Sequence, residues 1–361
     1  MKLLGIFRFE VAYQLRRPWI WLSMAVLAVF AFFSTRIAIV PVTLPQDFII
    51  NSPFIIASVT VFSCQIWLLL TPVVVGEAAA RDVHTGMYPL TWTSPISRSE
   101  YLGGRFLAAF VLHALILLAV QVGSLLAAHA PGVNPAIVGP FRPAAYLAAY
   151  AMIALPNALI AGAVQFAAAL ASGRPIAGYV GSMALFFLSY PVTFALYFSP
   201  LGQHALLADP IGVMAIMNEM MSNWTIVEKN VRMFTLDGAM LLNRLVWVAV
   251  ALLTLAVVHL RFRFAHRGES GLLSRFRGRL TRGARAADAA PARTEVTIPR
   301  VQQSFGLTTR LRQAFSIARS SFWTITRSPA GLFLLAGFPA FIVLVLLIDS
   351  EQWGIPLLPR T

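Results

Sequence analysis

The sequence repeats apolar stretches of about 20 residues, the length that a helix needs to cross a hydrocarbon core about 30 Å thick. Hydrophobic residues make up 58% of the 361 residues and charged residues only 12%, which excludes an ordinary water-soluble enzyme. We therefore expect an all-α, polytopic membrane protein. The seven candidate spans are residues 19–40, 54–76, 106–128, 144–172, 176–198, 241–260 and 331–348.

Three prolines lie inside these predicted spans, namely Pro72, Pro156 and Pro191. A proline inside a helix removes one backbone donor and crowds the preceding turn. Membrane helices tolerate this where neighbouring groups satisfy the freed carbonyl, so we expect kinks, not helix ends.

The distribution of positive charge predicts the orientation of the chain. Basic residues collect before the first span, after the second and the fourth, and between the sixth and the seventh, where 14 Arg lie between positions 261 and 327. The segment 199–240, on the opposite side, carries four acidic residues against Lys229 and Arg232. This pattern predicts a multi-pass membrane protein with a cytoplasmic N-terminus.

The first 17 residues predict an amphipathic helix on the inner leaflet. Leu4, Phe7 and Val11 recur at helical spacing, and Arg8 and Arg16 lie elsewhere on the helical wheel.

A second polar segment, residues 266–310, is rich in Gly, Ala and Arg and has no apolar period over most of its length. It predicts a flexible basic linker close to anionic lipid. Nucleic-acid binding is the weaker alternative, because aromatic residues for base stacking are nearly absent there. The expected partners therefore include membrane lipids and no nucleic acid.

Several kinds of catalytic chemistry are missing from the sequence. Only Lys2 and Lys229 are lysines, and neither belongs to the GxxxxGK[ST] loop that binds ATP phosphates. No HExxH zinc motif occurs, and the single Cys64 excludes both an intrachain disulfide and a cysteine metal site. We expect no catalytic residue, no cofactor and no metal in this chain.

Proton-coupled transporters usually carry an ionisable residue at membrane depth. In the predicted spans we find His113 and three glutamines, while Arg36 lies near a span end and can extend to the interface. A polar contact between helices is the favoured interpretation of His113, so secondary transport is disfavoured.

The connection between the second and third spans, residues 76–106, carries the most information. Glu77 and Arg81 are spaced for a helical ion pair, and Asp82 follows them. Ser97 and Glu100 form a capping box that starts a new helix leading into the third span. Residues 84–89 supply turn formers between these helices. The residues alone also fit an ordinary solvated loop.

This connection resembles the corresponding loop of type-2 ABC transporter permeases, the membrane subunits of bacterial ABC exporters. The residues that carry the resemblance are Glu77, Arg81, Asp82, Thr85, Gly86, Leu90, Thr93, Ser94, Pro95, Ile96, Ser97, Arg98, Tyr101, Leu102, Gly103, Gly104 and Arg105. The resemblance covers residues 1–265 and implies a six-helix permease module. It also implies that this loop holds a coupling helix that docks on a separate ATP-binding subunit.

A narrower likeness is to permeases in which two membrane modules precede a zinc aminopeptidase-like domain. No peptidase residues lie in this stretch, so that activity is not assigned to it.

The resemblance implies a permease module that forms half of a translocation pathway and moves substrate when the ATP-binding subunit changes conformation. A second module, in cis or in a dimer, would supply the other half. Two alternatives stay open, a secondary transporter or channel and a non-transporting membrane scaffold. An apolar interior with a few amides suits lipids, peptides and other amphiphiles equally well.

Residues 311–361 predict the beginning of a second permease module. A shift of 311 positions aligns Ile6, Arg8, Arg16 and Pro18 with Ile317, Arg319, Arg327 and Pro329. Leu311, Phe315, Ala318 and Phe322 repeat an apolar face before the span at 331–348. The alternative is that a seventh helix simply completes a seven-span protein.

Overall fold

The computed structural model describes residues 2–37, 49–197, 200, 202–264 and 306–326. All regular elements in these ranges are helical, which confirms the expected all-α class. The chain divides into one unit that contains Met1–Arg263 and another that contains Phe264–Leu344, and each is described by itself. The predicted span at 331–348 lies outside the described residues.

The first unit contains five helical segments that are long and apolar enough to cross a membrane, and these confirm the membrane-spanning character of the chain. They are Pro18–Arg36, Pro53–His84, Arg98–Ala128, Pro143–Ser172 and Gly238–Arg261. They match the predicted first, second, third, fourth and sixth spans. The fifth predicted span contains a shorter apolar helix, Ala177–Tyr190.

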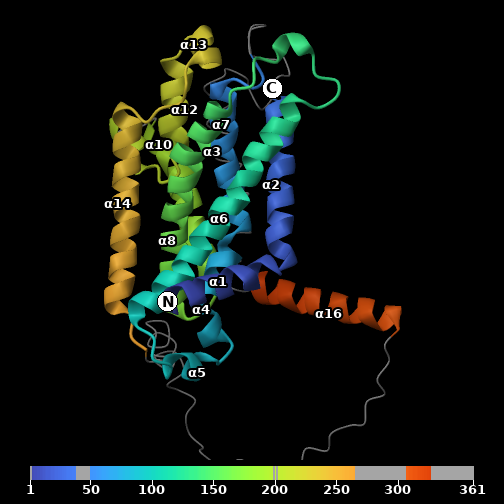
Figure 1. The fold of residues 1–361 in the computed structure, drawn as a ribbon, viewed down its shortest axis with the longest axis vertical. Coiled ribbons are helices and arrows are strands. Elements are labelled where there is room, and N and C mark those ends of the chain that lie inside the picture. The colour runs from blue at the N-terminus through green and yellow to red at the C-terminus, as the bar shows by residue number, and fades with distance from the viewer. Residues whose placement is uncertain (1, 38–48, 198–199, 201, 265–305, 327–361) are drawn as a thin grey trace, which may run out of the picture. The chain divides into compact units, whose positions relative to one another are not determined.

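The individual helices of this bundle have the following bounds: α2 (Pro18–Ile37), α3 (Pro53–Leu70), α4 (Pro72–His84), α6 (Arg98–Ala128), α7 (Pro143–Ala149), α8 (Leu155–Ser172), α9 (Ala177–Phe187), α10 (Thr193–Tyr197) and α14 (Gly238–Arg261). Consecutive membrane-spanning segments run in opposite directions. The segments that connect them therefore lie at the two ends of the bundle (Figure 1).

Each internal proline lies at an irregularity of its helix. α3 ends at Leu70 and α4 begins at Pro72. A π-helical turn, η2 (Tyr150–Ala154), precedes Pro156, and a second one, η3 (Leu188–Val192), contains Pro191. A π turn absorbs the backbone disruption that a proline causes. The helical path continues beyond each irregularity, as the sequence predicts.

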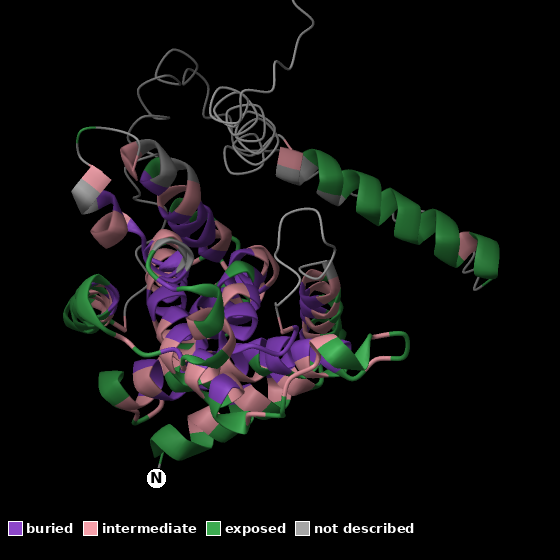
Figure 2. Cartoon of the chain, turned by 90° about the horizontal axis from the view of Figure 1, so that it is seen from above, coloured by how far each residue is buried: buried purple, intermediate pink, exposed green. Residues whose placement is uncertain are grey.

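The core of the bundle lies around α3 and α4, whose apolar stretch is 72% buried. Buried residues gather in the interior of the bundle (Figure 2). Glycines allow the closest approaches between helices. A Cβ atom on Gly123 of α6 would lie 2.2 Å from the carbonyl oxygen of Ala28 on α2. A Cβ atom on Gly76 would lie 2.2 Å from the carbonyl oxygen of Pro175. Such small-residue contacts are typical of helix packing in membranes.

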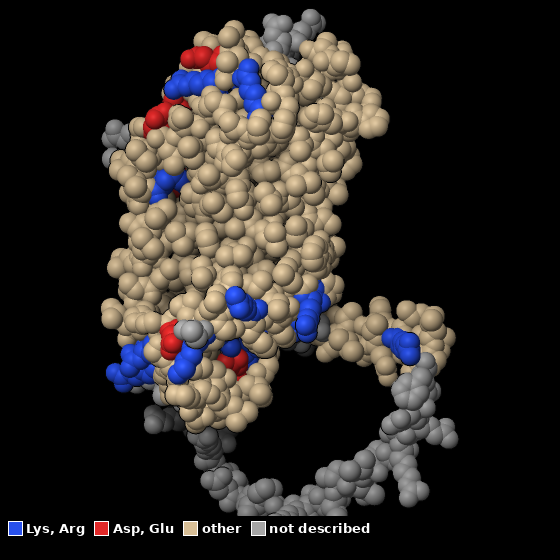
Figure 3. Space-filling model, in the orientation of Figure 1, with Lys and Arg blue, Asp and Glu red and all other residues tan. Residues whose placement is uncertain are grey.

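Short helices cover the two ends of the bundle. At one end lie α1 (Lys2–Leu15), which crosses the bundle, and α5 (Tyr88–Trp92). At the other end lie η1 (Pro135–Ile137), α12 (Val213–Ser222) and α13 (Ile226–Val231). α11 (Gly202–Ala208) packs against α10, α12 and α14. Charged side chains gather towards the ends, and the middle band carries few of them on the face that Figure 3 shows.

The second unit contains one described helix, α16 (Leu307–Thr326). It includes Leu311, at which the predicted second module begins. The linker predicted at 266–310 is described only from residue 306 onward.

The N-terminal helix α1 is present as predicted, and its polar side faces the protein. The buried residues of α1 are Glu10 and Gln14. Leu4 is exposed, and Phe7 and Val11 are half-buried. Arg81 and the carbonyl of Val74, both on α4, hold this polar side of α1 against the bundle. The predicted contact of the apolar residues with the inner leaflet stays a prediction.

Candidate functional site

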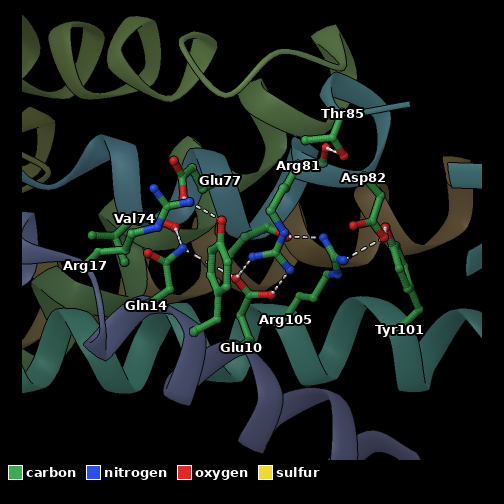
Figure 4. A network of polar contacts seen from close by, with 12 residues as sticks. Glu10, Gln14, Arg17, Val74, Glu77, Arg81, Asp82, Thr85, Tyr101 and Arg105 are labelled. Carbon is green, nitrogen blue, oxygen red and sulfur yellow. Dashed lines mark hydrogen bonds and ion pairs between the residues drawn. The ribbon is translucent and has the colours of Figure 1, made fainter. Parts of the chain in front are cut away.

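The candidate site lies at the bundle end that α1 crosses, where α1, α4 and α6 meet (Figure 4). The contact between α1 and α6 depends on Gly104. A Cβ atom at this position would lie 2.9 Å from the carbonyl oxygen of Leu3 and 3.0 Å from the Cβ of Ile6. The predicted capping box also forms here, since Ser97 and Glu100 exchange hydrogen bonds at the start of α6.

The central contact is a buried ion pair between α1 and α4. Arg81 donates from Nη1 to Glu10 Oε1 at 2.8 Å and from Nη2 to Glu10 Oε2 at 2.7 Å. The Glu10 side chain is fully buried and that of Arg81 is 13% exposed. The helical ion pair predicted between Glu77 and Arg81 is therefore wrong, because Arg81 turns to the buried carboxylate on α1.

A second buried ion pair joins α4 to α6. Arg105 Nη2 lies 2.6 Å from Asp82 Oδ2, and Arg105 Nη1 donates to the carbonyl of Ala78 at 2.8 Å. The hydroxyl of Tyr101 donates to Asp82 Oδ2 at 3.2 Å. We call Glu10, Arg81, Asp82, Tyr101 and Arg105 the α1–α4–α6 network.

A more exposed group borders this network. The guanidinium of Arg17, between α1 and α2, donates to the Tyr13 hydroxyl and lies 4.0 Å from Glu77 Oε2. The hydrogen bond with Tyr13, followed by the charge of Glu77, raises the pKa of Arg17 above its ordinary value. Glu77 thus contacts the start of α2 and not the helical neighbour that the sequence predicts.

The remaining predicted loop residues form the exposed connection between α4 and α6. Gly86 has a φ of 71°, a left-handed conformation that favours glycine and lets the chain turn after α4. Thr85, Pro95 and Arg98 are exposed, and Ser94 is half-buried, with its hydroxyl on the carbonyl of Leu90. The carbonyl of Pro95 accepts a hydrogen bond from the Lys2 ammonium group. Arg8 and Arg16 are also exposed.

The residue spacing alone predicts only turns at 84–89, whereas the structure contains the short helix α5 within this connection. It exposes Met87, just before its first residue, at 51% and Leu90 at 68%. On its other side, the ring of Trp92 lies 6.2 Å from that of Phe262, which in turn stacks on Tyr101 at 5.6 Å. These aromatic contacts join α5 to the end of α14 and to the start of α6.

A second polar cluster lies deep in the bundle towards the other end, and sequence reasoning missed it. Arg244 of α14 is 4% exposed and Asp209, before α12, is 0% exposed. Arg244 donates to the side-chain oxygens of Asn157 at 2.7 Å and Asn243 at 2.5 Å. Asn243 Nδ2 donates to the carbonyl of Asp209 at 2.9 Å.

The carboxylate of Asp209 is fully engaged. It accepts hydrogen bonds from the Ser189 hydroxyl at 2.6 Å and from the backbone N–H groups of Ile211, Gly212 and Met214. Gln65 of α3 donates to the same hydroxyl at 3.0 Å. The cluster therefore ties the segment before α12 to α3, α8 and α14.

The histidine and glutamines singled out in the sequence are buried contacts between helices. His113 lies against Trp67, with ring centroids 4.7 Å apart, and Gln121 donates to the hydroxyl of Thr60 at 2.9 Å. Gln165 donates to that of Ser182 at 2.7 Å. Among the described residues, no group of three or more His, Cys, Asp or Glu side chains is placed to hold a metal ion.

Two weak sequence signals point to the missed residues. Glu10 is the only acidic residue before Asp47, in a segment with four basic residues ahead of the first span. Arg244 lies inside a predicted span, where a charge without a partner is costly.

In comparisons with known proteins, no family model and no curated protein matches the chain.

Proposed function

We propose that this chain is a permease subunit of an ABC transporter, an exporter of the bacterial inner membrane, driven by a separate ATP-binding subunit. The observation that carries the proposal is α5, a short helix with exposed apolar residues at the bundle end crossed by α1. A subunit that binds this helix would meet Met87 and Leu90 first. These two exposed apolar side chains offer a partner an apolar docking contact.

The surroundings of α5 support a coupling role. The preceding helix, α4, is joined to α1 by the Glu10–Arg81 pair and to α6 by the Asp82–Arg105 pair. Trp92 joins α5 to the end of α14 through Phe262. A displacement of α5 would therefore move several helices together, because buried ion pairs and packed rings resist separate motion.

The proposal assigns no catalytic residue to the chain, and ATP hydrolysis takes place on the partner. A second permease module, in cis or as a second copy, completes the pathway, and lipids surround the module. In this proposal the N-terminus is cytoplasmic, and the ATP-binding subunit lies on the same side of the membrane as α1 and α5.

Site-specific crosslinking tests this proposal. A photoreactive benzoylphenylalanine replaces Leu90 in the full chain, expressed in its native host. We expect a crosslink to a protein that contains a GxxxxGK[ST] motif and whose ATP hydrolysis rises when it binds the permease. The matched control is the same residue at Leu147 of α7, which is 62% exposed, close to the 68% of Leu90. Equal crosslinking at both positions, or none at Leu90, contradicts the proposal.

The Asp209–Arg244 cluster favours one alternative, a secondary transporter, because ionisable residues deep in a membrane protein often carry protons. However, hydrogen bonds already engage both oxygens of the Asp209 carboxylate, and Arg244 is held by two amide side chains. This arrangement is more typical of a structural connection. Transport in vesicles that stops when a proton gradient is dissipated, and that needs no ATP, would favour the alternative.

A non-transporting scaffold is the remaining alternative. Vesicles that contain the permease and its ATP-binding subunit, yet show no ATP-dependent movement of any lipid or peptide from the native membrane, would favour it.

A further inference from the structure

Helix α16 has one continuous apolar strip. Leu307, Leu311, Phe315, Ala318 and Phe322 follow one another at intervals of three or four residues, which places them on one side of a helix. All five are exposed, with Leu311 at 62% and Phe315 at 72%. From Leu307 to Phe322 this strip extends over about 22 Å, at 1.5 Å per residue.

Arginines border the apolar strip on both sides. At 100° per residue, Arg312 and Arg319 lie about 40–80° from Phe315 and Phe322 on one side of the strip. On the other side, Arg310 lies about 60° from Leu307. The helix contains no acidic residue. Among the described residues, no acidic side chain forms an ion pair with any of these three arginines.

The side opposite the apolar strip is small, polar and uncharged. It carries Thr309, Gln313, Ser316 and Ser320. α16 thus has an apolar strip, arginines at both borders of this strip, and a neutral polar side. The exposed Ile317 and Trp323 lie between the arginines and the polar side. A helix that lies flat in a membrane interface needs this order, because its apolar side enters the acyl region while arginines at the borders reach the phosphates.

We propose that α16 is a membrane-surface helix that binds an anionic lipid leaflet. Phe315 and Phe322 enter the boundary between headgroups and acyl chains, and Arg310, Arg312 and Arg319 contact lipid phosphates. The positive charge selects anionic headgroups. This inference is independent of the ATP-driven function, since it rests only on the sectors of α16.

Charge favours a lipid surface over a protein groove as the occupant of this strip. A groove in a protein partner would cover the apolar strip without requiring arginine on both of its borders. The chain also carries ten Arg between positions 261 and 300, just ahead of the helix, so the sequence around α16 adds to the attraction for an anionic surface.

The helix α1 differs from α16 in the residues that it presents to its surroundings. Its buried side carries Glu10, paired with Arg81, and Gln14, so the bundle holds it through polar contacts. The apolar strip of α16 contains no polar residue. The two helices therefore differ in their partners, although their sequences align in part.

The test uses the full chain in nanodiscs, with the buried Cys64 replaced by serine and a cysteine at Ala318 that carries an environment-sensitive NBD dye. We expect blue-shifted emission and strong quenching by doxyl-labelled lipid in discs that contain phosphatidylglycerol. In discs of phosphatidylcholine alone, both the blue shift of the emission and the quenching should be small. The matched control places the dye at Ser316, on the polar side, where quenching should be weak in both lipids.

Charge variants complete the test. Replacing Arg310, Arg312 and Arg319 together with glutamine should lower the ratio of bound to unbound α16 by roughly 100-fold in anionic discs. Replacing them with lysine should largely keep binding, which distinguishes a charge effect from unfolding of the helix.

Three outcomes overturn the proposal. They are equal quenching at Ala318 and Ser316, equal quenching of Ala318 in both lipids, and burial of the Ala318 dye only when a second copy of the chain or a protein partner is present.

Discussion

Arg81 of α4 and Glu10 of α1 are 71 positions apart in the sequence and are joined by two hydrogen bonds of 2.8 and 2.7 Å. This bidentate pair is nearly fully buried, so it fixes both the position and the rotation of α1 on the bundle. Removing one partner leaves a buried charge without compensation, which costs more than the pair itself contributes.

We therefore expect Glu10→Gln to lower the free energy of unfolding by about 3–5 kcal/mol. Thermal unfolding of the purified protein in detergent measures this effect. The matched control is Glu77→Gln, which removes a carboxylate that lies 4.0 Å from the exposed Arg17 and should cost about 1 kcal/mol or less. Equal losses in the two variants would show that α1 is held by other contacts.

The close approach of α1 to α6 predicts a difference between two adjacent glycines. Gly104→Ala places a methyl group 2.9 Å from the carbonyl oxygen of Leu3, so it should displace α1 and destabilise the protein by about 1–3 kcal/mol. Gly103→Ala places its methyl group 3.4 Å from the flexible Leu3 side chain. It should be neutral, or stabilising by up to about 1 kcal/mol through helix propensity.

Thermal unfolding of both glycine variants checks this prediction, together with protease cleavage within α1. Faster cleavage in Gly104→Ala alone indicates that α1 has moved away from α6. If Gly103→Ala is the more harmful substitution, the packing described for α1 and α6 is wrong.

The Asp209–Arg244 cluster predicts a strong effect at Gly212. An added Cβ atom there would lie 2.3 Å from Arg244 Nη2, and the φ of 82° disfavours any other residue. Gly132 has a similar φ of 79° but open space around it. Gly132→Ala should therefore cost about 1–2 kcal/mol from backbone strain alone.

Gly212→Ala should cost roughly 2 kcal/mol more than Gly132→Ala, because Arg244 must also leave its partners. Chemical denaturation of both variants measures the difference. Indistinguishable losses would indicate that Arg244 can move without cost and that the cluster does not hold the segment before α12.

The alternating helices predict that the connections at the two ends of α6 lie on opposite sides of the membrane. With Cys64 replaced, a cysteine at Thr85 should be labelled by an impermeant thiol reagent only after the cells are opened. A cysteine at Asn134 should be labelled in intact cells. Labelling of Thr85 in intact cells would reverse the orientation inferred from the positive charges.

The predicted linker offers an independent check of the same orientation. A cysteine at Ser274 should behave as the one at Thr85 does, because both belong to segments rich in arginine. Opposite behaviour of Ser274 and Thr85 would contradict the positive-charge rule for this chain.

The sequence by itself determines the helices and their irregular points. Apolar length predicts α2, α6 and α14, and the prolines at 72, 156 and 191 predict where helices are interrupted. Ser97 and Glu100 predict where α6 begins. These signals act within a few residues of chain, through hydrophobic length, a missing donor or a cap, so no distant partner changes them.

Only the tertiary structure decides which charges meet. Local spacing favours Glu77 as the ion-pair partner of Arg81. However, α1 crosses α4 and brings the buried carboxylate of Glu10 close to Arg81. The desolvated charge of this carboxylate attracts Arg81 more strongly. Asp209, Asn157 and Arg244 likewise come together only because α8, α14 and the segment before α12 pack against one another. Burial strengthens such contacts, and burial depends on the packing of the whole bundle.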